Sequence, residues 1–151
     1  GRAYWIIQRP NFEKPAEVEE LYVIEAGPGE KVIVLPNFGH ILVNAFREPL
    51  ITANWINATI TYDYAPYRQL RGSGYWMIEG SQPDTIEFPK NPNYSRVPEL
   101  KKLRPREIPE FGLRRGEPAY LLTRNLEKLD FLLNPERYLE LLTLNRCFRI
   151  S

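Results

Sequence analysis

The stretch VLPNFGHILVN, from Val34 to Asn44, contains His40, the only histidine in the 151-residue chain. Imidazole is the side chain whose ordinary pKa lies nearest neutrality, and it is a common metal ligand. A lone histidine is more often a packed or surface residue than a ligand. His40 nevertheless follows a tight Pro-Asn-Phe-Gly turn and opens an apolar segment, a position from which its ring could point into the mouth of a barrel.

The chain lacks the sequence motifs of several other common functional sites. The chain has no Gly-rich phosphate loop before a helix, no Cys-x-x-Cys pair and no His-Glu-x-x-His sequence. A formal net charge of +1 gives no electrostatic case for binding nucleic acid or an anionic membrane. No apolar run approaches the length that spans a bilayer. Cys147 is the only cysteine, so no intrachain disulfide can form, and we expect a reducing, cytoplasmic compartment.

Short apolar segments between Gly and Pro turns predict the scaffold that positions these residues. We expect strands in residues 3–8, 21–26, 31–36, 40–46, 50–56 and 73–80. No helical pattern interrupts them, which argues against a parallel sheet built from βαβ units. The pattern therefore predicts an all-β fold, an antiparallel sandwich or barrel.

The composition changes after Gly80. Seven prolines lie between Pro83 and Pro118, so we expect this segment to hold neither a long helix nor a central strand and to wrap over the surface. We divide the chain into a β-barrel core, residues 1–80, and an extension, residues 81–151.

Two short helical segments are expected at the end of the extension, in residues 125–133 and 135–145. Asn125 and Asn134 are the candidate N-caps, and a proline occupies the first helical position of the second segment. We expect both segments to pack on the barrel.

Residues 28–50, PGEKVIVLPNFGHILVNAFREPL, resemble the second conserved motif of the cupins. That motif runs from Pro-Gly through an apolar strand, a proline and a short turn to a histidine, a second apolar strand and an asparagine. The stretches GRAYWIIQ, REPLITANWI and YDYAPYRQLRGSGYWMIEG are similar to segments of the archaeal-type, cupin glucose-6-phosphate isomerases and their bacterial relatives. The resemblance covers roughly residues 1–80 and implies a cupin-like antiparallel β-barrel of jelly-roll type.

The resemblance also implies an activity and a cofactor. These enzymes interconvert glucose 6-phosphate and fructose 6-phosphate with one divalent metal, such as iron, manganese, nickel or zinc, held by three histidines and a glutamate. Only the last ligand maps onto this chain, at His40. The motif with the other three ligands would precede Gly1. We therefore expect a piece of a longer product that binds divalent metal weakly and shows no appreciable turnover by itself.

The same resemblance suggests the residues that would contact a sugar phosphate. Tyr62 stands where the family has a further histidine, and Asp63 and Tyr64 match the family. The hydroxyls of Tyr62, Tyr64 and Tyr67 could bind sugar hydroxyls, or the rings could simply pack. Gln8 could face the cavity or belong to the core or rim.

Two alternatives to a complete enzyme site stay open. A carboxylate among Glu17, Glu19 and Glu20 could replace the missing glutamate, although a solvated loop is their expected place. The chain could also be a non-catalytic cupin, a sugar-binding or structural module. Cupins of this type often pair, so a homodimer is expected.

Overall fold

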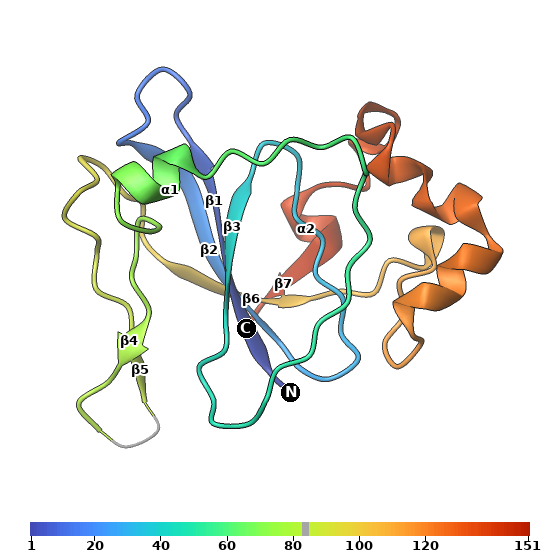
Figure 1. The fold of residues 1–151 in the computed structure, drawn as a ribbon, viewed down its shortest axis with the longest axis horizontal. Coiled ribbons are helices and arrows are strands. Elements are labelled where there is room, and N and C mark those ends of the chain that lie inside the picture. Colours follow the sequence, from blue (N-terminus) through green and yellow to red (C-terminus); the bar gives the residue numbers. More distant parts are fainter. Residues whose placement is uncertain (83–84) are drawn as a thin grey trace.

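The computed structural model describes residues 1–82 and 85–151, and two sheets form its frame. The larger sheet has the strand order β3-β1-β2-β6-β7. Its strands are β1 (Ala3–Pro10), β2 (Val18–Ala26), β3 (Gly39–Val43), β6 (Lys101–Pro105) and β7 (Phe148–Ile150). The short strands β4 (Ile78–Glu79) and β5 (Ile86–Glu87) form a separate antiparallel ribbon. In Figure 1 the larger sheet lies between this ribbon and the C-terminal helical turns.

Helical residues occur only in short segments of the described chain. They are α1 (Ala65–Gln69), α2 (Leu144–Cys147) and the 3-10 helices η1 (Pro109–Phe111), η2 (Ala119–Arg124), η3 (Leu126–Leu132) and η4 (Pro135–Tyr138). Asn125 and Asn134 occupy the N-cap positions of η3 and η4, but neither side chain makes a capping hydrogen bond. Among the described residues no helix combines the length and apolarity that a bilayer crossing requires.

The chain is mostly sheet with little helix, which agrees with the all-β prediction at that level. The predicted barrel is wrong, because the described strands do not close: the larger sheet ends at β3 on one side and at β7 on the other. The sheet is not purely antiparallel either, since β2 pairs with β6 in parallel.

The strand predictions succeed where an apolar run finds a partner. The runs at 3–8 and 21–26 become β1 and β2, and His40 lies in β3. The predictions at 31–36 and 50–56 are wrong, because neither stretch contains a strand. Ile33 and Leu35 still enter the core, whereas Ile51 is 90% exposed.

The proline-rich extension contains a central strand, contrary to expectation. Strand β6 lies between β2 and β7, and Leu103 is buried at its middle. Residues 101–104 are free of proline, and Pro105 occupies the last position, where a missing N–H costs the ladder least. Of the seven prolines, Pro83 lies outside the described residues.

Each face of the larger sheet packs against a different part of the chain. One core cluster joins Ile7 and Ile24 to buried residues of the C-terminal turns, including Phe111 and Phe131. The other joins Ile6, Leu21 and Val23 to Tyr75 and Tyr94. The alternation along β1 therefore decides which packing layer a side chain meets.

Candidate functional site

His40 is the second residue of β3, at an outer strand of the larger sheet. The β1–β3 register places His40 opposite Ile7 and Leu42 opposite Trp5. Directly opposed residues of an antiparallel pair share a face, so His40 and Trp5 lie on the same face. The imidazole and indole ring centroids are 5.4 Å apart.

A hollow of about 400 Å³ opens beside this ring pair, and we call it the His40 hollow. Its lining is Trp5, His40, Ile41, Leu42, Thr52, Ala53, Asn54, Tyr64 and Tyr67. It therefore combines aromatic and aliphatic walls with an imidazole, two phenols, a hydroxyl and an amide. Such a surface suits a small polyhydroxy ligand, whose hydroxyls and carbon skeleton both need partners.

The hollow affects the charge state of its histidine. Burial lowers the pKa of His40 below its ordinary value of 6.5, and no charged neighbour contributes to the shift. Removal from water disfavours the imidazolium. The side chain remains partly open to solvent, so the effect is a moderate one. The shift favours the neutral form of His40, which has a nitrogen lone pair available.

The tyrosines differ in their relation to the hollow. Tyr62 and Tyr64 stack with centroids 5.8 Å apart and planes inclined by 10°, and both are more than half exposed. Tyr64 lines the hollow, whereas Tyr62 does not. Asp63 accepts a hydrogen bond from the Ala65 backbone N–H at 2.9 Å, which shapes the turn into α1.

Tyr67 reaches from α1 to the start of β3. Its hydroxyl is buried and has no hydrogen-bond partner among the described residues. A β-carbon added to Gly39 would lie 2.5 Å from that oxygen, so only glycine allows the ring to approach so closely. Burial raises the pKa of Tyr67 far above its usual range, and the phenol stays protonated.

Gln8 does not join the His40 hollow. It is 4% exposed. Because it directly follows Ile7 in β1, its side chain lies on the opposite face of the sheet from Ile7 and Trp5. Its Nε2 donates to the Tyr94 hydroxyl at 3.1 Å, and its Oε1 accepts from the Gly74 backbone N–H at 2.9 Å. The structure therefore engages both ends of this amide within the fold.

The glutamates weighed as replacement ligands lie elsewhere. Glu19 and Glu20 form ion pairs with Arg9, and Glu17 pairs with Arg96 at 3.1 Å. No group of three or more His, Cys, Asp or Glu side chains in the described residues is arranged to hold a metal ion. The donor set around His40 does not fit a divalent metal, because a single imidazole supplies one ligand of the four or more such ions require.

Sequence reasoning missed the other residues of the hollow, chiefly Trp5, Thr52 and Asn54. Trp5 shares a face with Ile7 because the two are two residues apart in a strand, but the pairing of Ile7 with His40 is known only from the structure. Thr52 and Asn54 carried no usable signal, since they belong to a segment expected to be a strand and found without one.

Comparison with protein families gives one match. The family model described as Glucose-6-phosphate isomerase (GPI) matches residues 1–93, more than half of the chain. Every residue that lines the His40 hollow falls within that range. The comparisons with curated proteins and with solved structures returned no match.

Proposed function

Because the chain belongs to the glucose-6-phosphate isomerase family, we propose that the His40 hollow binds a hexose phosphate and serves the interconversion of glucose 6-phosphate and fructose 6-phosphate. The observation that carries the proposal is the place of His40. The only histidine of the chain lines a ligand-sized hollow inside the family-matched region.

The reaction needs a base of moderate strength, because a hydrogen moves between C1 and C2 of the sugar. A neutral imidazole is suited to accept a proton near pH 7. We assign this role to His40, whose lowered pKa keeps its lone pair free. The polar groups of Thr52, Asn54 and Tyr64 would hydrogen-bond the sugar hydroxyls, and Trp5 would cover an apolar side of the ring.

The metal dependence implied by the resemblance is a separate matter. The residues present do not fit the ion, so no step is assigned to it. We propose that these residues retain divalent metal weakly. Elemental analysis of the purified protein, with iron, manganese, nickel and zinc measured together, tests this. Stoichiometric metal that survives dialysis against a chelator would contradict it.

A sugar-binding module without turnover is the second candidate, and one observation favours it. His40 is the only lining side chain of the hollow that titrates near neutrality. Isomerisation also requires a proton to pass between the two oxygens, and burial raises the pKa of Tyr67, so this phenol keeps its proton. On this second candidate, the residues of the hollow bind the sugar phosphate with little turnover of their own.

The experiment separates the two candidates. Fructose 6-phosphate binding is measured by calorimetry, and glucose 6-phosphate formation by a coupled assay, for the wild type and His40→Ala. Binding and turnover that both fall at least tenfold in His40→Ala support the isomerase. Binding that falls without any turnover in the wild type supports the module. Binding unaffected by His40→Ala removes the hollow from both proposals.

Location and assembly remain predictions. We propose a reducing compartment, the cytoplasm, on the ground of the single buried Cys147. A homodimer is also proposed, and the edge strands of the larger sheet, β3 and β7, are the strands at which a partner strand could pair. Light scattering of the purified chain measures the oligomeric state.

A further inference from the structure

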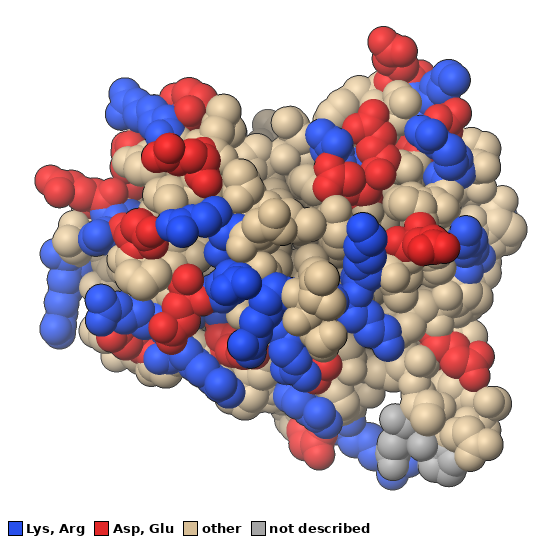
Figure 2. Space-filling model, turned by 180° about the vertical axis from the view of Figure 1, so that it is seen from behind, with Lys and Arg blue, Asp and Glu red and all other residues tan. Residues whose placement is uncertain are grey.

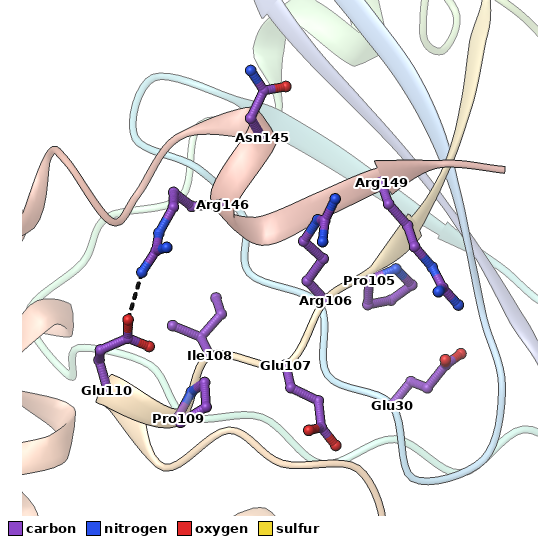
Figure 3. Close-up of a pocket in the computed structure, with 10 residues that line it drawn as sticks. All are labelled: Glu30, Pro105, Arg106, Glu107, Ile108, Pro109, Glu110, Asn145, Arg146 and Arg149. Atoms are coloured by element: carbon purple, nitrogen blue, oxygen red, sulfur yellow. Dashed lines mark hydrogen bonds and ion pairs between the residues drawn. The ribbon is translucent and has the colours of Figure 1, made fainter.

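A second hollow, of about 410 Å³, lies at the opposite margin of the larger sheet, between the end of β6, η1 and the α2–β7 segment. Its charged lining consists of Arg106, Arg146, Arg149, Glu30, Glu107 and Glu110, and we call it the arginine hollow (Figure 3). Apart from Glu30, these residues lie outside the family-matched range.

The strand register gathers positive charge at this place. Arg149 of β7 lies directly opposite Arg104 of β6, and like charges in such a pair destabilise a sheet. Glu25 compensates Arg104 with an N–O distance of 3.0 Å. Arg149 forms no ion pair with a carboxylate of the described residues. An anion bound beside Arg149 would supply the missing compensation.

The side chain of Arg106 is held in place by the fold but does not use all its hydrogen-bond donors. Its Nε donates to the Phe148 carbonyl at 2.9 Å, and its backbone N–H donates to the Cys147 carbonyl at 2.8 Å. These bonds fix the guanidinium at the rim and leave its two terminal nitrogens for a ligand. Preorganised guanidinium groups match the oxygens of a phosphate in a bidentate manner.

The carboxylates of the arginine hollow are already engaged on one side. Glu110 binds Arg146 at 2.5 Å. Glu107 accepts the Arg115 backbone N–H at 2.6 Å, and Glu30 accepts the Gly27 backbone N–H at 2.7 Å. Three carboxylates would repel a ligand that is anionic all over. Their free oxygens would instead accept hydrogen bonds from hydroxyl groups.

We propose that the arginine hollow is a second binding site, for a small polyhydroxy compound that carries a phosphate group. Arg106 and Arg149 hold the phosphate, and the Glu30 carboxylate, on the side toward which Arg149 points, accepts hydrogen bonds from the hydroxyls (Figure 3). The volume is at the scale of such a ligand. On the face seen in Figure 2, basic and acidic side chains are intermingled, which favours a local ligand over an extended polyanion. The described lining of the His40 hollow has no Lys or Arg, so a hexose phosphate held there by its sugar would keep its phosphate group in solvent.

The test measures the affinity of the full chain for glycerol 3-phosphate, inorganic phosphate and glycerol by calorimetry at low ionic strength. Arg149→Gln removes an exposed side chain that forms no ion pair with the described residues and relieves the repulsion with Arg104, so the thermal midpoint should stay the same or rise slightly. We expect it to weaken binding of glycerol 3-phosphate at least tenfold. Arg124→Gln, which removes an exposed arginine of η2, is the matched control and should have no effect.

We expect the chain to bind glycerol 3-phosphate more tightly than inorganic phosphate and not to bind glycerol. Equal effects of Arg149→Gln and Arg124→Gln, or glycerol bound as well as its phosphate, would overturn the proposal. Arg106→Lys keeps the positive charge but loses the paired N–H donors of the guanidinium, and it should also weaken phosphate binding. His40→Ala should leave this binding intact, so failure here is distinguishable from failure of the proposed isomerase site.

Discussion

The imidazole of His40 lies against the indole of Trp5, with the ring centroids 5.4 Å apart and the ring planes inclined by 38°. The two residues come from neighbouring strands, and the antiparallel register places them on one face of the sheet. The contact withdraws part of the imidazole from water and offers no charge in return. Burial of the imidazole at the edge of the hollow lowers the pKa of His40 and so favours its neutral form.

The first prediction is a His40 pKa below 6.5, because burial is the only cause of its shift. NMR titration measures it without ambiguity, since the chain has no other histidine. Trp5→Leu should move the pKa back toward 6.5, while Trp76→Leu, on a segment outside the hollow, should leave it unchanged. A wild-type value at or above 6.5 would contradict the account.

The same shift predicts how stability depends on pH. Below pH 6.5 the unfolded chain takes up the histidine proton more readily than the folded chain, so unfolding is favoured as pH falls through this window. Stability should rise again with pH until both states are neutral. Denaturant midpoints of the wild type and His40→Gln, compared from pH 5 to pH 8, should differ in slope only in the acidic part. Parallel curves throughout would rule the linkage out.

Gly39 is predicted to be required for the position of the Tyr67 ring against the start of β3. Gly39→Ala should lower the free energy of unfolding by about 1–3 kcal/mol, because the new methyl group cannot coexist with the phenol oxygen. Tyr67→Phe removes that oxygen, which is buried without a partner, and should be neutral or stabilising. Adding Tyr67→Phe to Gly39→Ala should then recover part of the loss. Strictly additive effects would show that the two residues do not compete for space.

Gln8 is predicted to act on stability. Gln8→Leu should cost about 1–3 kcal/mol of unfolding free energy, because the Gly74 N–H loses its buried acceptor. Gln69→Leu, at an exposed position of α1, is the control and should cost little. A stable Gln8→Leu protein with weakened fructose 6-phosphate binding would restore the contact role first assigned to this residue.

The sequence predicted the strand that carries His40 and left Gln8 open between the cavity and the core, and one residue of register decides on which face each side chain lies. His40 begins a strand after a turn, a feature readable from Pro36, Gly39 and the apolar run behind them. Gln8 pairs with Gly39, whereas Ile7 pairs with His40. A shift of one residue in the pairing moves a side chain to the other face of the sheet. The register depends on both paired strands, so the sequence of one strand does not determine it.

The fold was predictable where local sequence and tertiary pairing agree. Strands β1 and β2 consist of β-branched and aromatic residues, and Pro10 ends the first. Strand β6, KKLRP, has no such pattern. It becomes a strand because it pairs with β2 and β7. Residues 50–56 show the converse, a run of suitable residues that finds no partner strand. Barrel closure depends on such pairings and could not be derived from the runs.

The most direct test of the central claim follows the ring signals of His40 while fructose 6-phosphate is added. Because His40 is the only histidine, its imidazole resonances report on the hollow and on nothing else. We predict saturable shifts of these resonances, at ligand concentrations that match the affinity measured by calorimetry. Binding detected by calorimetry while the His40 resonances stay unchanged would contradict the assignment of the His40 hollow as the hexose phosphate site.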